Sequence, residues 1–292
     1  MKTSHLFIAA LLCVAWGVNA AAAKVGVTYA PPIFFTAMRF LIVLVLLLPW
    51  LRVAPVAGQW RILLPGVFFL GALHFSLIFT GAKMSSATAM AIVNQLWIPI
   101  AALMALFWLG EQVPVARWIG IAIAFLGVVV FSLDSTASAH WSGILILVID
   151  AVSMALGTVL LRRLAPIPPL VMQAWMAAIG FPLLALASFL IEDGQFAALR
   201  VAPSQEWITL AYTVIGGSLI GHTFYYFLLQ RYDVSLVSSM LLVAPLIGVL
   251  SGILILGEPF TAEIGIGTAL TLGGVAIVLL PNPRALISGW KR

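Results

Sequence analysis

The sequence predicts an all-α integral membrane protein with ten transmembrane helices, arranged as two inverted five-helix repeats. Two observations lead to this prediction. Hydrophobic residues make up 63% of the 292 residues and charged residues only 8%, too few to cover the surface of a soluble domain. In addition, the phrase Leu109-Gly110-Glu111 returns 147 residues later as Leu256-Gly257-Glu258.

Matching residues stand on both sides of this phrase, and the matching pairs are Gly120 with Gly267, Gly127 with Gly274, and Pro99 with Pro245. We therefore divide the chain into a first five-helix repeat, residues 1–136, and a second repeat, residues 137–292. Because each repeat holds an odd number of helices, the second copy enters the membrane upside down. That geometry is typical of transporters.

The ten helices follow from apolar segments near or above the ~20 residues that cross a bilayer. Breakers such as Pro31-Pro32, Pro114 and Pro168-Pro169 separate them. We predict the helices at about residues 5–23, 33–51, 61–81, 86–109, 115–133, 141–161, 168–191, 207–229, 234–256 and 261–281. The first segment also resembles a secretory signal, with Lys2 before it and Ala20 to Ala23 at its end. Removing it would leave nine helices, so we expect it to remain.

The cations predict the orientation. Ten crossings place both termini on one side, and that side holds Lys2, Arg52, Arg61, Arg117, Arg162, Arg163, Arg231, Arg284, Lys291 and Arg292. The other side holds Lys24, Lys83 and Arg200. By the positive-inside rule both termini are cytoplasmic, and we expect a multi-pass protein of a bacterial inner membrane. The net charge of +5 is thus a topology signal, and no nucleic-acid partner is predicted.

Metal and cofactor chemistry find little support in the sequence. Cys13 is the single cysteine, and His5, His74, His140 and His222 show no ligand spacing, so we predict neither a metal site nor a cofactor. No phosphate-binding loop of the Gly-x-x-x-x-Gly-Lys-Ser/Thr kind is present. Any driving force for transport would therefore come from gradients.

Two charged residues fall at membrane depth. Arg39 and Asp150 lie about 10 and 13 Å from the outer side at 1.5 Å per helical residue, so they could meet. One interpretation is a neutralised Arg39–Asp150 pair. The other is a site that faces substrate, with Arg39 receiving a carboxylate or Asp150 an amine. Asp150 is also the candidate proton carrier if export is proton-coupled.

The histidines repeat as well. His222 lies 148 residues after His74, an equivalent place in inverted helices. One interpretation is that they line the two ends of one pathway, His74 toward the outer face and His222 toward the inner one. The other is that each bonds a neighbouring helix backbone and serves packing.

Aromatic and amide residues complete the candidate cavity. Trp16 and Asn19 share one helix face, and so do Asn94 and Trp97, which suits an amphiphilic metabolite. The alternative is that the amides tie helices together and the indoles fill space. Tyr226 joins the candidate set.

Pro99 and Pro245 each remove a backbone hydrogen bond inside the fourth helix of a repeat. We treat both as candidate hinges, with static kinking as the alternative.

These residues resemble a known family. Trp16-Gly17-Val18-Asn19, Lys24 with Gly26, Pro31-Pro32, Arg39-Phe40 and the twice-used Pro…Gly-Glu…Gly…Gly-Val are similar to the drug/metabolite transporter superfamily, in its ten-helix EamA branch. The resemblance implies two inverted five-helix repeats around a central cavity, and export of amino acids or other small metabolites. The stretch Asn94-Gln95-Leu96-Trp97-x-Pro99 is similar to exporters of aromatic amino acids, whereas the first forty residues resemble exporters of cysteine-pathway metabolites at least as much.

We therefore expect a secondary transporter that exports small metabolites, most favourably amino acids or related amphiphilic compounds, by alternating access. Its partners would be a small-molecule substrate and the lipid bilayer, while proton coupling and the oligomeric state stay open. The rivals are an intramembrane enzyme, for which there is no His-Glu-x-x-His and no aspartate pair, and a structural or assembly membrane protein. The latter would not need matching polar residues in inverted positions.

Overall fold

The computed structural model describes residues 2–53, 58–109, 114–134, 140–164, 167–229, 231–232, 237 and 240–279, and every regular element among them is helical. The first half contains α1 (Thr3–Tyr29), α2 (Pro32–Leu47), η1 (Leu48–Arg52), α3 (Trp60–Val67), η2 (Phe68–Leu73), α4 (His74–Met84), α5 (Ala87–Val93), η3 (Asn94–Leu96), α6 (Trp97–Leu109) and α7 (Val115–Ser132). The second half contains α9 (Trp141–Leu161), α10 (Pro169–Ile191), α11 (Gln195–Val201), α12 (Ser204–Tyr212), η4 (Thr213–Ile220), α13 (Gly221–Leu229), α15 (Val243–Leu256) and α16 (Ala262–Leu279).

Eight helices or continuous helical runs in the described ranges are long and apolar enough to cross a membrane. Besides these, α12, η4 and α13 form one unbroken run, and α15 is a shorter apolar helix. Helical residues thus occur in each of the ten segments expected from the sequence. The number of crossings itself stays a prediction.

Two local differences from the sequence expectation have physical reasons. Helix α1 continues past Lys24 to Tyr29, whereas the sequence predicted an end near residue 23. The charge of Lys24 is tolerated inside the helix because its ammonium donates to the carbonyls of Ala82, Lys83 and Ser85 at 2.8, 3.1 and 2.5 Å, around the carboxyl end of α4. Helix α11 was not expected, since seven residues are too few to show a helical period.

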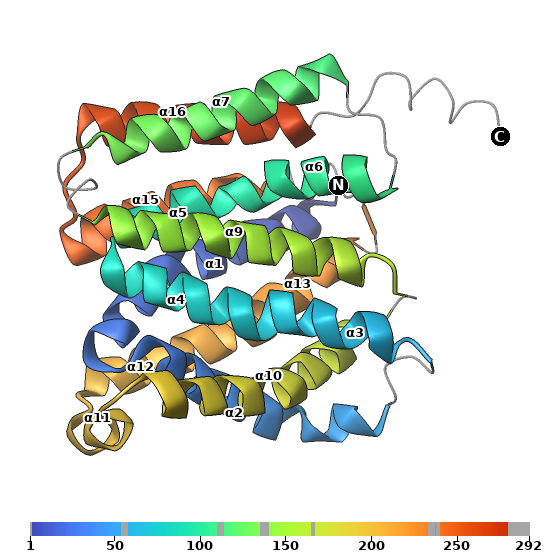
Figure 1. Cartoon of the computed structure of the whole chain (residues 1–292), viewed down its shortest axis with the longest axis vertical. Helices are drawn as coiled ribbons and strands as arrows, with labels where there is room; N and C mark the ends of the chain where they lie inside the picture. The colour runs from blue at the N-terminus through green and yellow to red at the C-terminus, as the bar shows by residue number, and fades with distance from the viewer. Residues whose placement is uncertain are drawn as a thin grey trace.

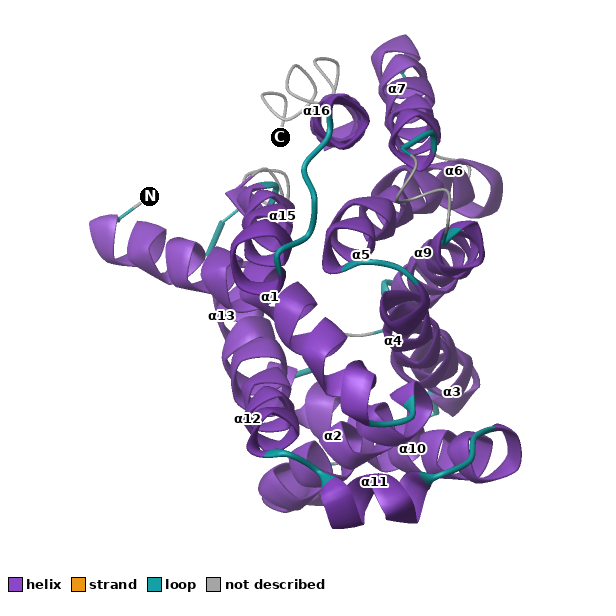
Figure 2. Ribbon diagram, turned by 90° about the vertical axis from the view of Figure 1, so that its left-hand side faces the viewer, coloured by secondary structure: helices purple, strands orange, loops and turns teal. Residues whose placement is uncertain are grey.

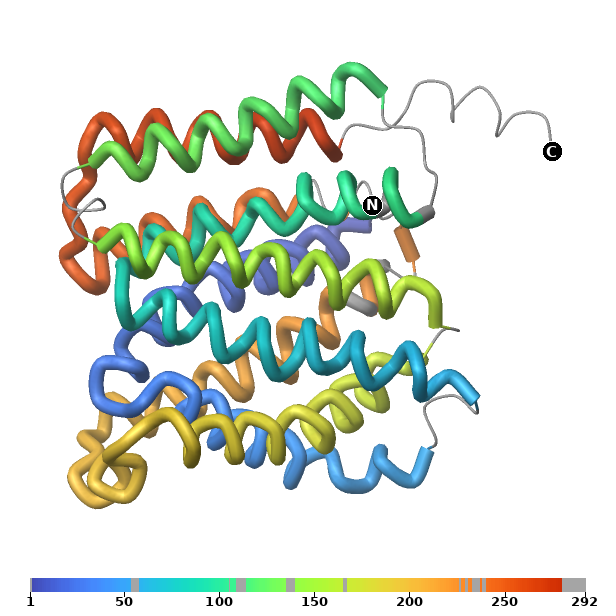
Figure 3. The backbone as a smooth tube through the Cα atoms, viewed as in Figure 1, coloured from blue at the N-terminus to red at the C-terminus, as the bar shows by residue number. Residues whose placement is uncertain are grey.

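The helices run roughly antiparallel across the view in Figure 1, with α7 and α16 along one edge of the bundle and α2 and α10 along the other. The tube in Figure 3 shows the chain passing back and forth, so that the connections gather at the two ends of the bundle. Figure 2 looks along many of the helices and shows α1 and α9 in the middle layers.

Most of the extensive contacts join a helix of the first half to one of the second. Helix α1 packs on α15 and on the α12–η4–α13 run, while α9 packs on the α5–η3–α6 run and on α4. Helix α2 packs on α10, and α7 on α16. Exchanging the halves according to the sequence repeat turns the contacts of α1 into those of α9, and it turns the α2–α10 and α7–α16 contacts into themselves.

Helices α7 and α16 approach one another closely at the repeated glycines. A Cβ atom at Gly127 would lie 2.8 Å from Gly267 O, and one at Gly267 would lie 2.8 Å from Gly127 O. Likewise, a Cβ atom at Gly120 would lie 2.7 Å from Gly274 O, and one at Gly274 would lie 2.5 Å from Gly120 O. The backbones are too close for any larger residue. Replacing each glycine by its repeat counterpart turns the Gly127–Gly267 contact into the Gly274–Gly120 contact, as across a two-fold axis.

The second copy of the Gly-Glu phrase has a clear local role. Gly257 ends α15 in the left-handed conformation at φ 68°, which turns the chain toward the start of α5. The Glu258 carboxylate then accepts from the backbone N–H groups of Ala87 and Thr88 at 2.6 and 2.9 Å. This contact satisfies two donors that a helix start leaves unpaired. The first copy, Gly110-Glu111, lies outside the described residues.

Candidate functional site

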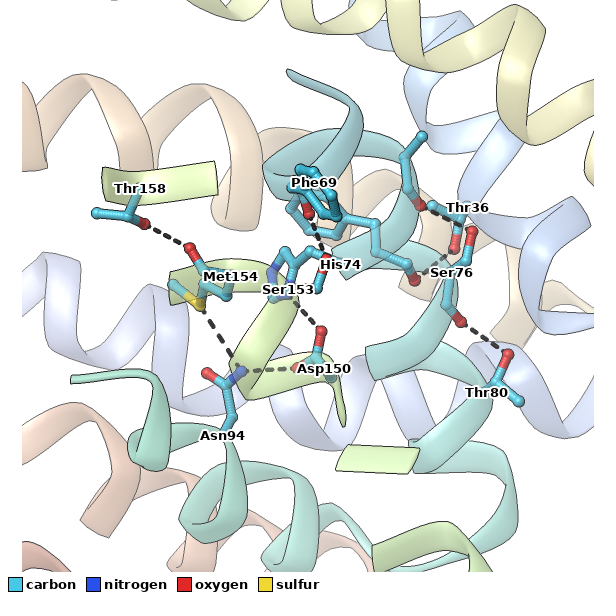
Figure 4. A network of polar contacts seen from close by, with 12 residues as sticks. Thr36, Phe69, His74, Ser76, Thr80, Asn94, Asp150, Ser153, Met154 and Thr158 are labelled. Carbon is cyan, nitrogen blue, oxygen red and sulfur yellow. Dashed lines mark hydrogen bonds and ion pairs between the residues drawn. The ribbon is translucent and has the colours of Figure 1, made fainter. Parts of the chain in front are cut away.

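Two groups of polar side chains lie inside the bundle, and the buried carboxylate of Asp150 is at the centre of the first. His74 Nδ1 at the start of α4 is 2.6 Å from Asp150 Oδ1 on α9, and Asn94 Nδ2 on η3 donates to Asp150 Oδ2 at 2.8 Å (Figure 4). The Asp150 side chain is fully buried. Both carboxylate oxygens therefore have partners, and three helical segments meet on one ionisable group.

Arg39 on α2 lies in a second group. Its Nε and Nη2 atoms donate to Ser218 Oγ on η4 at 3.1 and 2.9 Å, and its guanidinium lies over the rings of Phe75 and Phe79, 4.6 and 5.8 Å from their centroids. The side chain is 2% exposed. Stacking on two rings partly replaces the lost hydration of the cation.

The neutralised Arg39–Asp150 pair considered from the sequence does not form. The depths of the two residues along their helices allow a meeting, but their directions do not. Helix α4 packs against both α2 and α9, and its consecutive residues His74 and Phe75 contact Asp150 and Arg39 respectively. Asp150 and Arg39 thus lie against different faces of α4 and do not contact one another.

The aromatic residues of α1 and α13 gather on η4. Trp16 Nε1 donates to Gly217 O at 3.2 Å, and His222 Nδ1 lies 3.1 and 3.2 Å from the carbonyls of Gly217 and Ser218. The rings of Trp16 and His222 meet edge to face at 5.5 Å. Asn19 also faces this segment, since a Cβ atom at Gly217 would be 2.6 Å from Asn19 Oδ1.

The two repeated histidines occupy matching backbone contexts. The π-helical segment η2 ends directly before His74, and the π-helical segment η4 ends two residues before His222. In each case the first helix of the other half donates a side-chain hydrogen bond to a carbonyl of the irregular segment: Ser153 to Phe69 O at 2.8 Å, and Trp16 to Gly217 O. Such π segments inside helices often mark functional sites.

The remaining candidates take different places. Trp97 packs, partly buried, on the main hydrophobic core. Pro99 and Pro245 are each the third residue of a helix, α6 and α15. Pro245 lies in the first turn of α15, where the missing N–H costs little. Helix α6 continues the α5–η3 segment, so Pro99 lies inside an unbroken helical run and cannot donate the backbone hydrogen bond there. The Tyr226 side chain lies outside the part of the chain that the structure describes. A hinge role for the prolines stays a prediction.

Sequence reasoning missed Ser218 and Ser153, the hydroxyl groups that bind Arg39 and Phe69 O. A weak signal existed for Ser218. It directly follows Gly216-Gly217, and such a run of small residues lets another helix come close and expose backbone carbonyls.

Comparison with known proteins gives concordant results. The model of the EamA-like transporter family matches residues 3–133 and again residues 141–280. An "Uncharacterized transporter" of Archaeoglobus fulgidus is 27% identical, with 93% of this chain and 97% of that protein covered. A "Probable amino-acid metabolite efflux pump" of Salmonella typhimurium is 26% identical, with 95% of each chain covered. A solved crystal structure at 24% identity has a TM-score of 0.66 over 95% of this chain and 98% of that one, which shows a shared fold.

Proposed function

Because the chain belongs to the EamA-like transporter family, a branch of the drug/metabolite transporters, we propose that it exports small metabolites, amino acids or related amphiphilic compounds, by alternating access. It is a multi-pass membrane transporter and not an enzyme, and a small molecule and the bilayer are its partners. The amino-acid class draws on the name of the Salmonella relative and on the pairing of indoles with amides at Trp16, Asn19, Asn94 and Trp97.

The observation that carries the proposal is the pair of adjoining polar groups within the bundle. Arg39, His74 and Asp150 are all buried, and their partners come from both halves of the chain. Ionisable side chains at membrane depth are costly and mark substrate or ion pathways. A merely structural membrane protein would have no need to bury them.

The arrangement of the halves supports alternating access. The helix contacts map onto one another when the halves are exchanged, and the repeated glycines of α7 and α16 pair crosswise. Two inverted halves can rock about such an axis and expose one central site to either side in turn. With the bias of Lys and Arg, we place both termini in the cytoplasm of a bacterial cell.

We assign the proton-holding role to the His74–Asp150 pair. The two groups are 2.6 Å apart and buried, so they can share one proton and release it when the site opens. Proton-driven export needs such a carrier, whereas movement down a substrate gradient does not.

The test is efflux from bacterial cells that overproduce the chain. Cells are loaded with each of the twenty L-amino acids, and the appearance of each outside is measured against cells producing Asp150→Asn. We expect faster efflux of at least one amino acid with the unaltered chain, and a dependence on the pH gradient that Asp150→Asn removes. If purified chain in sealed vesicles moves none of the twenty, the assignment of amino acids as its substrates is wrong.

A further inference from the structure

The π-helical segment η4 holds a glycine where two helices of the first half meet it. A Cβ atom at Gly217 would lie 2.6 Å from Asn19 Oδ1 on α1 and 3.4 Å from Arg39 Nη2 on α2. Asn19 Oδ1 and Arg39 Nη1 are both buried, and neither has a hydrogen-bond partner among the described residues. Asn19 and the guanidinium of Arg39 therefore flank the same glycine, and each has one buried polar atom without a partner among the described residues.

Arg39 is also a buried cation without a carboxylate partner. Within the described ranges the single salt bridge joins His74 to Asp150, and the second Asp150 oxygen is taken by Asn94. Ser218 provides only a neutral hydroxyl group. An uncompensated buried charge costs several kcal/mol, and a guanidinium is well shaped to bind a carboxylate. An anion bound at Arg39 would therefore compensate its buried charge.

We propose that Arg39, Asn19 and Gly217 form a subsite for the charged end of an α-amino acid. The substrate carboxylate binds Arg39 through Nη1, and its ammonium group donates to Asn19 Oδ1. The absence of a side chain at Gly217 lets Asn19 and Arg39 approach η4 closely, since an added Cβ atom would displace Asn19 Oδ1. The inference rests on the proposed export function and deepens it, because it assigns the amine to Asn19 and leaves Asp150 to His74.

The backbone under this subsite is held from two directions. Trp16 donates to Gly217 O, and the His222 ring contacts the carbonyls of Gly217 and Ser218. These contacts satisfy carbonyls of an irregular segment and fix the position of Gly217. Trp16 and His222 thus act as positioning residues: they contact the backbone of η4 and hold Gly217 in place beneath the subsite.

Binding can be measured on the full-length protein in lipid nanodiscs by thermal unfolding in the presence of each of the twenty L-amino acids. For the amino acid that raises Tm most, its amide and its deaminated acid are the matched probes. We expect the amide, which lacks the carboxylate, to bind about tenfold more weakly or worse, and the deaminated acid to lose less. Sodium chloride at equal concentration distinguishes an inorganic anion from an amino acid.

Two variants separate this subsite from the fold. Gly217→Ala should weaken amino-acid binding, whereas Gly273→Ala, where an added Cβ meets nothing within 4 Å, should not. Asn19→Asp places a carboxylate beside Arg39, so it should raise Tm in the absence of ligand and abolish amino-acid binding. Because Asp and Asn have nearly the same size, a change in Tm or binding in this variant cannot be attributed to lost packing.

The outcomes are distinct. Wild-type affinity in both Gly217→Ala and Asn19→Asp, together with intact efflux, would overturn the subsite and leave the export function standing. Protection by chloride alone, with no amino acid effective, overturns the assignment of an amino acid to this site. Absence of efflux from the unaltered chain overturns the export function itself.

Discussion

His74 Nδ1 and Asp150 Oδ1, which belong to residues 76 positions apart in the chain, lie 2.6 Å apart in the interior of the bundle. The contact links α4 of the first half to α9 of the second. Since both side chains are almost fully buried, neither can exchange this partner for water. The link therefore joins the two halves through a contact that water cannot replace.

Removing one member of this pair should destabilise the protein. His74→Ala leaves the Asp150 carboxylate with Asn94 alone, and we expect a loss of about 3–5 kcal/mol in unfolding free energy. Adding Asp150→Asn to that variant should restore much of the loss, because the carboxylate left with too few partners is then gone. Thermal unfolding in detergent measures both. Equal loss in the single and double variants would show that the pair matters only through packing.

Close packing of α7 on α16 gives a second prediction. In Gly127→Ala the new Cβ atom would meet the backbone of Thr271 and Gly267, which cannot rotate away. We expect a destabilisation of about 1–3 kcal/mol, with Gly273→Ala within about 0.5 kcal/mol of the unaltered chain. Both variants add one methyl group to a helix. A similar loss of unfolding free energy in the two would show that Gly127 is not needed for close packing of α7 on α16.

The Glu258 contact predicts a measurable contribution to stability. Glu258→Gln keeps the shape of the side chain but removes the charge that binds Ala87 and Thr88 at the start of α5. We expect a loss of about 0.5–2 kcal/mol, as for other helix caps. The exposed Glu263, in the first turn of α16, is the matched control, and Glu263→Gln should cost less. A larger effect at Glu263 would contradict this assignment.

Membrane orientation can be tested with a reporter that is active only in the cytoplasm. Fused after residue 114 or after Arg292 it should be active, and after residue 260 it should be inactive, because the cations of the chain concentrate on one side. Activity at all three positions would exclude an inverted second half.

Much of this protein could be predicted from its sequence alone. A membrane protein, the approximate helices and the repeated glycines and histidines all follow from hydrophobicity and spacing, which depend on residues close in the chain. The charged residues of the interior could also be predicted from the sequence, because few charged side chains such as Arg39 and Asp150 occur inside apolar segments.

What only the tertiary structure decided is which of these residues meet. Arg39 and Asp150 lie at similar depths, but the rotation of α2 and α9 about their own axes directs Arg39 to Ser218 and Asp150 to His74. That rotation is set by side chains of neighbouring helices far away in the chain, and α4 is the helix that packs on both. The placement of Asn19 and Arg39 around Gly217 has the same origin, because a spacing along one helix contains no information about the helix that packs against it.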